Sequence, residues 1–184
     1  MSSSRMIPAS IVLSACLLLV PQANAGEPIE LGGKKAVTVL AAVTAESEFA
    51  SATLVGSADV AYITKSARFE ISGGIRAVGL LAGPGRFAAY FPYVGARVNS
   101  NLFGPEENML VYFGANAGVG IFTVDVDDDD ESEVAFRAGP NFGIEYYLTP
   151  RFALRLDNAV SIGTGAEDSV SASNTTSFGA RFLF

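Results

Sequence analysis

Apolar and polar residues alternate along this chain with a repeat of two. In residues 68–81, "RFEISGGIRAVGLL", Phe69 and Ile71 fall on one face. Glu70 and Arg76 fall on the opposite face of the same segment. A repeat of two is typical of a β-strand with one apolar and one polar face. The sequence therefore predicts strands whose two faces meet different surroundings.

The same alternation predicts eight strands. They span residues 36–44, 52–64, 69–81, 87–99, 109–124, 134–148, 152–163 and 175–184. The first two are the least distinct, because Ala and Ser blur the alternation. No segment shows the repeat of 3.6 residues that marks an amphipathic helix. We therefore expect an all-β fold.

The predicted connections are of two kinds that tend to alternate along the chain. "KSA" at residues 65–67 and "TPR" at residues 149–151 are tight turns, the second fixed by Pro150. Residues 125–133 are acidic, and residues 164–174 are small and polar, which predicts longer loops. Residues 100–108 break the pattern, because they form a long connection where a short one is expected.

Residues 1–25 have the features of a signal peptide. Arg5 supplies the positive charge, residues 7–20 form a short apolar core, and "ANA" ends at Ala25 as a small-residue cleavage site. An alternative is a lipoprotein signal at Cys16, but the apolar core continues past that cysteine. We expect cleavage after Ala25, a short segment at 26–35 and a barrel at 36–184.

The chain is apolar for its size. Hydrophobic residues make up 49% and charged residues only 17%, against about 25% in an ordinary soluble domain. After the leader, no apolar run is long enough for a helical membrane span. Two all-β solutions remain, namely a soluble barrel with apolar residues inside and a membrane barrel with apolar residues outside.

The polar faces favour the membrane barrel. Eight charged residues lie opposite the aliphatic residues: Glu70, Arg76, Arg97, Arg137, Glu145, Arg155, Asp157 and Arg181. A transmembrane barrel has an apolar exterior and a polar interior. Its closure also pairs every backbone N–H and C=O, as hydrocarbon surroundings require. We therefore predict an eight-stranded antiparallel up-and-down transmembrane barrel.

The chain ends in "TTSFGARFLF", although termini usually fray. In a closed barrel the last strand pairs with the first, so the end is held in place. Phe178, Phe182 and Phe184 would then face lipid, with the terminal ring in the interfacial aromatic girdle.

Several stretches resemble the small OmpA/OmpX-type outer-membrane barrels, including the opacity-like members. These are "FGIEYYLTPRFALRLDN" at 142–158, the terminal "FGARFLF", "YVGARVN" at 93–99 and "GANAGVGIF" at 114–122. The resemblance implies a signal peptide, export by the general secretory route, periplasmic termini, short periplasmic turns and longer surface loops. It also implies that Phe178, Phe182 and Phe184 form an insertion signal for the barrel-assembly machinery.

The chain has no histidine, the usual general base of outer-membrane hydrolases and acyltransferases. Lysine-assisted serine chemistry is possible in principle, but the three lysines after the leader are all expected near strand ends. We therefore expect no enzyme activity and no cofactor. The net charge of −7 disfavours nucleic acid as a partner.

Two hypotheses account for the charged residues predicted in the interior. They could form an ion gate, or they could fill the lumen as a salt-bridge network. An eight-stranded barrel is only wide enough for side chains to fill, and buried charges need partners. This width argument favours the network.

Two hypotheses also account for the acidic segment at residues 125–131. Asp125, Asp127, Asp128, Asp129, Asp130 and Glu131 could bind divalent cations, or bridge them to lipopolysaccharide phosphates. They could equally form a solvated acidic loop, and the spacing of a calcium-binding EF-hand fails here. We assign no metal site with confidence.

Three functions follow from these observations. The first is a monomeric outer-membrane barrel with a structural or surface-interaction role, in contact with membrane lipids and lipopolysaccharide. The second is a narrow porin-like channel. The third is a soluble exported barrel that binds an apolar ligand.

Overall fold

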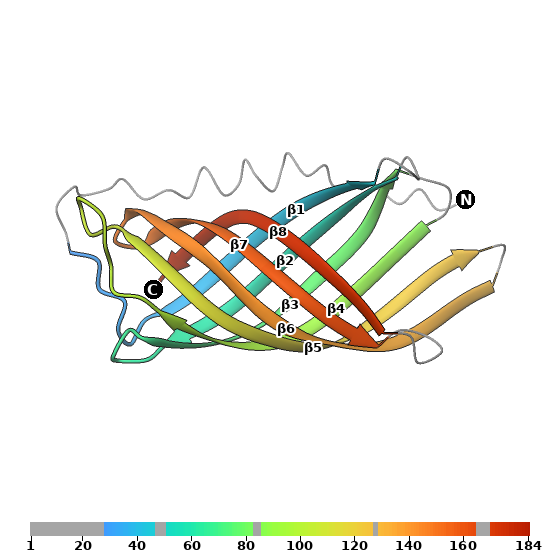
Figure 1. Cartoon of the computed structure of the whole chain (residues 1–184), viewed down its shortest axis with the longest axis horizontal. Coiled ribbons are helices and arrows are strands. Elements are labelled where there is room, and N and C mark those ends of the chain that lie inside the picture. The colour runs from blue at the N-terminus through green and yellow to red at the C-terminus, as the bar shows by residue number, and fades with distance from the viewer. Residues whose placement is uncertain (1–27, 47–50, 83–85, 127–128, 165–169) are drawn as a thin grey trace.

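The strands form one closed antiparallel barrel in chain order. The computed structural model describes residues 28–46, 51–82, 86–126, 129–164 and 170–184 (Figure 1). The strands are β1 (Lys35–Glu46), β2 (Ser51–Ile63), β3 (Phe69–Ala82), β4 (Arg86–Asn99), β5 (Met109–Val126), β6 (Asp129–Thr149), β7 (Phe152–Thr164) and β8 (Val170–Leu183). In the part of the chain described, no helix is long and apolar enough to cross a membrane.

Closure joins the first strand to the last. β1 pairs with β8 from Ala36 opposite Leu183 to Ala41 opposite Phe178. Beyond β8, the N–H of Phe184 donates to the carbonyl of Lys35 at 2.9 Å, and the N–H of Lys35 donates back at 3.0 Å. The terminal phenylalanine therefore has both backbone groups paired, which explains why an aromatic end need not fray.

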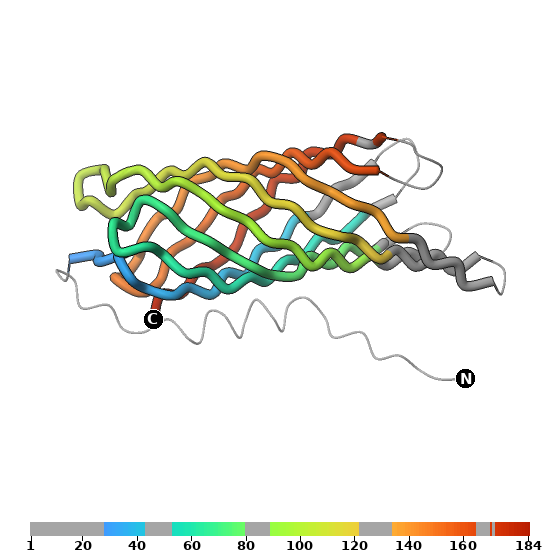
Figure 2. Tube along the Cα trace, turned by 90° about the horizontal axis from the view of Figure 1, so that it is seen from below, coloured from blue at the N-terminus to red at the C-terminus, as the bar shows by residue number. Residues whose placement is uncertain are grey.

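The barrel has two unlike ends. We call the end with the start of β1 and the close of β8 the terminal end, and the opposite end the distal end. Short turns at the terminal end connect β2 to β3 and β6 to β7. β5 and β6 are the longest strands, with 18 and 21 residues, and their hairpin projects furthest at the distal end (Figure 1). The strands run obliquely to the barrel axis, as the tube view shows (Figure 2).

Large apolar side chains cover the outside of the barrel. The exposed ones include Val60, Phe69, Ile71, Ile75, Val94, Phe113, Val119, Ile121, Phe136, Phe142, Leu156, Ile162 and Phe178. Val94, near the middle of β4, is 67% exposed, whereas Arg97 on the same strand is buried in the lumen. This apolar belt is the exterior that a lipid bilayer accommodates. It disagrees with a soluble barrel that keeps its apolar residues inside.

The two predicted loops at the distal end are shorter than expected. β5 continues to Val126 and β6 begins at Asp129, with Asp125 opposite Asp130, so most of the predicted 125–133 loop is strand. Likewise β8 begins at Val170, inside the predicted 164–174 loop. In both places the antiparallel ladder supplies backbone partners that outweigh the low strand preference of Asp and Ser.

An apolar cluster fills the terminal end of the lumen. Its buried members are Leu31, Ala36, Ala61, Ile63, Leu110, Tyr112, Tyr147, Ala153 and Leu183, with Ile29, Ala67 and Leu102 packed against them. Ile29 and Leu31 precede β1, so the segment before the barrel folds onto its mouth. We call this cluster the apolar plug.

Candidate functional site

Six charged side chains meet in the lumen beside the apolar plug. They are Glu70 on β3, Arg97 on β4, Glu145 on β6, Arg155 and Asp157 on β7, and Arg181 on β8. We call this set the charge network. All six are buried, and Arg181 and Glu145 are fully so. The inward face of each strand positions them, because alternate residues point to the same side.

Glu145 lies at the centre of the charge network. Arg97 Nη1 donates to its Oε1 at 2.7 Å, Arg181 Nη1 lies 3.3 Å from the same oxygen, and Arg155 Nη1 lies 4.0 Å away. The hydroxyl of Tyr147 donates to the other oxygen, Oε2, at 2.8 Å. One carboxylate thus serves arginines from three different strands.

Glu70 forms the second centre. Arg181 reaches it with a fork of two hydrogen bonds, at 3.0 Å to Oε1 and 2.5 Å to Oε2. Arg97 Nη2 lies 2.9 Å from Oε2. A forked arginine–carboxylate pair is both strong and geometrically specific. This pair links β3 to β8 across the lumen.

Tyr112 on β5 joins Arg155 to Asp157. Arg155 Nε donates to the Tyr112 hydroxyl at 2.8 Å, and that hydroxyl donates to Asp157 Oδ1. Arg155 Nη2 also pairs with Asp157 Oδ1 at 2.8 Å. The Tyr112 ring lies 4.2 Å from the guanidinium carbon of Arg97 and 4.6 Å from that of Arg155. Both cations therefore contact an electron-rich ring face as well as carboxylates.

Gly143 makes room for this tyrosine. A Cβ added at Gly143 would overlap the Tyr112 hydroxyl and the carbonyl of Leu156. Gly120, further along β5, lies against the Phe91 ring in the same way. The glycines on the inward faces thus give space to the large polar and aromatic side chains of the lumen.

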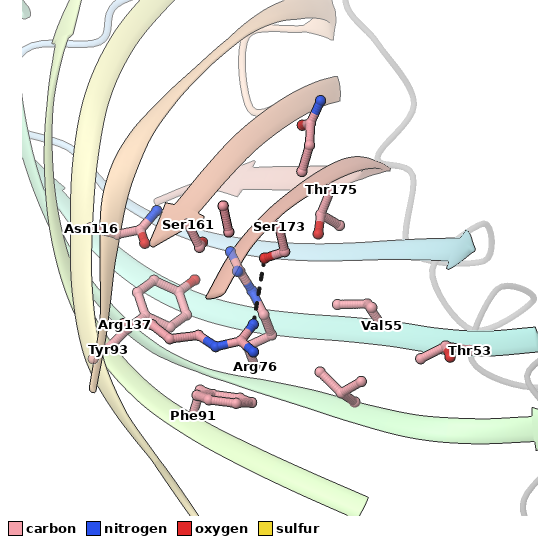
Figure 3. A pocket seen from close by; sticks show the side chains of 14 residues that line it. Thr53, Val55, Arg76, Phe91, Tyr93, Asn116, Arg137, Ser161, Ser173 and Thr175 are labelled. Carbon is pink, nitrogen blue, oxygen red and sulfur yellow. Dashed lines mark hydrogen bonds between the residues drawn. The ribbon is translucent and has the colours of Figure 1, made fainter. Parts of the chain in front are cut away.

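The remaining two predicted charges lie elsewhere. Arg76 on β3 and Arg137 on β6 are on the distal side of the charge network, where they line a cavity of about 360 Å³. We call this the distal cavity. Its polar lining also includes Tyr93, Asn116, Ser161 and Ser173. Figure 3 shows both arginine side chains extending into the same hollow, with Arg137 Nη1 donating to Ser173 Oγ at 3.5 Å.

A much smaller cavity of about 30 Å³ lies between the two regions. Asp59, Arg76, Tyr93, Arg97 and Asp157 all line it. Tyr93 donates to Asp59 Oδ2 at 3.2 Å. Side chains therefore occupy nearly all of the lumen between the distal cavity and the apolar plug.

The sequence interpretation missed several residues of the interior. Tyr112 and Asp59 were not assigned to the lumen, although both lie on inward faces. The signal for Tyr112 was its spacing of two from Gly114, a residue of the inward face. For Asp59 the alternation was blurred by the alanines beside it.

The acidic segment gives no metal centre in the part of the chain described. Asp127 and Asp128 lie outside the described residues, and Asp125, Asp129, Asp130 and Glu131 belong to the strands of the β5–β6 hairpin. No group of three or more metal-ligating side chains occurs among the described residues. Cation binding there stays a prediction.

The three terminal phenylalanines differ in their surroundings. Phe178 and Phe184 are exposed on the outside of the barrel. Phe182 is only partly exposed, because its ring packs against that of Phe152 with centroids 4.9 Å apart. The pairing places aromatic rings of β7 and β8 together on the outer face at the terminal end.

Comparison with known proteins finds likeness in structure alone. No family model matches the sequence, and no curated protein resembles it significantly. Neisserial surface protein A (NspA) is 17% identical with a TM-score of 0.61, and the match covers 82% of this chain and 96% of that one. The N-terminal barrel domain of Pseudomonas aeruginosa OprF is 12% identical with a TM-score of 0.59, covering 83% and 98%.

A third solved structure agrees. Ail, the attachment invasion locus protein of Yersinia pestis, is 14% identical with a TM-score of 0.53, and the match covers 82% of this chain and 97% of that one. All three neighbours match along nearly their whole length. The protein therefore has the closed eight-stranded fold of the small OmpA/OmpX-type outer-membrane barrels.

Proposed function

We propose that this protein is a small outer-membrane barrel that conducts no ions and exerts a structural or surface-interaction role through its distal end. The observation that carries the proposal is the combination of an apolar exterior with a lumen that the apolar plug and the charge network block. An apolar belt favours the bilayer, and a lumen blocked beside the terminal end leaves the distal end as the place for interactions.

The blocked lumen favours this role over a porin-like channel. The apolar plug occupies the terminal end, where Leu31, Ile63 and Leu110 are almost fully buried. Beside it, the charge network crosses from β3 to β8. A small eight-stranded barrel has just enough interior for such side chains.

A surface role also agrees with the neighbours. One is named a surface protein and another an attachment invasion locus protein. We infer that the terminal end faces the periplasm, that residues 1–25 direct export by the general secretory route, and that Phe178, Phe182 and Phe184 guide insertion by the barrel-assembly machinery. The proposed partners are membrane lipids and lipopolysaccharide, and the proposed state is a monomer without enzymatic activity.

Two measurements test membrane insertion and closure. Protein extracted from the outer membrane in mild detergent should migrate differently on gels when unboiled and boiled, because a closed barrel resists the detergent until heated. In planar bilayers, the same protein should give no discrete conductance steps. Discrete steps would instead support the narrow channel, and recovery in the soluble periplasm would contradict both membrane assignments.

Orientation can be tested with single cysteines, because Cys16 in the leader is the chain's one native cysteine. Thr164 is exposed at the distal end, and Asn101 is exposed at the terminal end. A membrane-impermeant maleimide should label Thr164→Cys in intact cells and label Asn101→Cys only after the outer membrane is permeabilised. The reverse pattern would contradict periplasmic termini.

A further inference from the structure

The distal cavity has the composition of a binding site for a small anionic sugar. We propose that it binds a phosphorylated or sulfated monosaccharide, which reaches the lumen from the distal end. This goes beyond the structural or surface role argued above, because that role requires no ligand inside the barrel. The argument depends on the cavity's charge, its hydrogen-bonding groups and its size.

Among the described residues that line the distal cavity, the charged side chains are two arginines. Arg76 and Arg137 line it, and no acidic side chain is among the described residues that do so. Among those residues Arg76 forms no ion pair; its charge lies over the Tyr93 ring, 5.9 Å from the centroid. The Arg137 guanidinium lies 5.2 Å from the centre of the Phe91 ring. Two guanidinium groups held on aromatic rings and directed into one hollow form a strong field for an anion.

The neighbouring groups suit the hydroxyls of a sugar. Asn116, Ser161, Ser173 and Thr175 line the same cavity from β5, β7 and β8 (Figure 3). Amide and hydroxyl groups both donate and accept hydrogen bonds, as sugar hydroxyls do. The rings of Phe91 and Tyr93 add an apolar surface on the β4 side. A few placed polar groups beside aromatic rings are typical of small-molecule sites.

The size and position of the cavity narrow the ligand further. Its volume of about 360 Å³ falls at the small end of the roughly 300–1,000 Å³ range of ligand pockets. The cavity is ringed by inward-facing residues of seven strands, β2 to β8, and so opens within the lumen and not onto the lipid belt. A free sugar anion fits this position, whereas the acyl chains of a lipid would have to leave the bilayer to reach it.

Titration calorimetry on the membrane-extracted protein in a neutral detergent tests the proposal. The probe is glucose 6-phosphate, with glucose and inorganic phosphate as comparison ligands. We expect saturable binding of glucose 6-phosphate, with at least tenfold weaker binding of either comparison ligand. Equal binding of glucose would overturn the role of the arginines, and equal binding of phosphate would overturn the role of the hydroxyl groups. No saturable binding of any of the three would overturn the site.

Variants locate the binding. Arg76→Gln should weaken glucose 6-phosphate binding at least tenfold, because a charge-assisted hydrogen bond is worth about 1.5–3 kcal/mol and each 1.4 kcal/mol is tenfold. Arg76→Lys should restore part of the affinity, since it keeps the charge and loses the fork. The matched control is Arg151→Gln, an exposed arginine in the terminal-end turn that should bind like the parent. A heat-dependent gel shift in every variant shows that each has folded, and unchanged binding by Arg76→Gln would contradict the proposal.

Discussion

The charge network and the distal cavity lie in one lumen and both contain arginines, but the surroundings of these arginines differ. In the network, Arg97, Arg155 and Arg181 are buried and each lies within ion-pairing distance of a carboxylate. In the cavity, Arg76 and Arg137 are partly exposed and no described acid shares the lining. The buried arginines need carboxylate partners, because a desolvated cation bears the full cost of leaving water, whereas a partly exposed arginine such as Arg76 bears only part of that cost.

The largest expected effect comes from removing the shared carboxylate. Glu145→Gln would leave Arg97 and Arg181 with one carboxylate, Glu70, between two buried cations. Breaking a buried ion pair costs about 3–5 kcal/mol. Urea unfolding in lipid vesicles should show a loss of that order in the free energy of unfolding. The control Glu30→Gln alters an exposed glutamate before β1 and should change little; equal losses in the two variants would contradict the importance of the network.

On the outer face of the barrel, an added charge should lower stability by an amount that depends on its position in the bilayer. Val94→Arg would place a cation in the apolar belt and should lower the free energy of unfolding in vesicles by about 2–4 kcal/mol. Phe103→Arg makes a comparable change in the turn at the terminal end, where the cost should be about 0–1 kcal/mol. If both variants lost the same stability, the belt would not lie at the depth of the bilayer.

A smaller effect is expected from the tyrosine that joins Arg155 to Asp157. Tyr112→Phe keeps the ring beside Arg97 and Arg155 but removes the hydroxyl that accepts from Arg155 Nε. A buried donor left without a partner costs about 1–3 kcal/mol. The matched control is Tyr62→Phe on the outside of β2, which should lose much less stability in the same unfolding assay. A loss no greater than the control's would show that the hydroxyl contributes little.

The alternation of apolar and polar residues predicted the barrel. Strands with one apolar and one polar face can satisfy a bilayer only as a closed sheet with the apolar face outside. The alternation also assigned Glu145, Arg155 and Arg181 to the inside, where they lie. It did not separate Arg76 and Arg137 from the charge network. Alternation indicates which face of a strand a residue lies on, but not how far along the barrel axis it lies. The position along the barrel axis depends on the register between tilted strands, and that register is fixed only when β1 pairs with β8.

Sequence patterns also failed to predict the length of the β5–β6 hairpin at the distal end. The aspartates around residue 125 read as a loop because Asp disfavours strands, yet the β5–β6 ladder continues past them. Tertiary pairing outweighed local preference there. The bond between Tyr112 and Asp157 was likewise invisible, since its partners lie 45 residues apart.

The central claim is that burial divides one lumen into a charge-paired layer and a solvent-reached cavity, and comparing Arg97→Gln with Arg76→Gln tests it most directly. Both variants remove one lumenal arginine, so their difference isolates the surroundings. Equilibrium urea unfolding in vesicles should show a loss of about 3–5 kcal/mol for Arg97→Gln and a change within about 1 kcal/mol for Arg76→Gln. Equal losses in the two variants would contradict the division of the lumen.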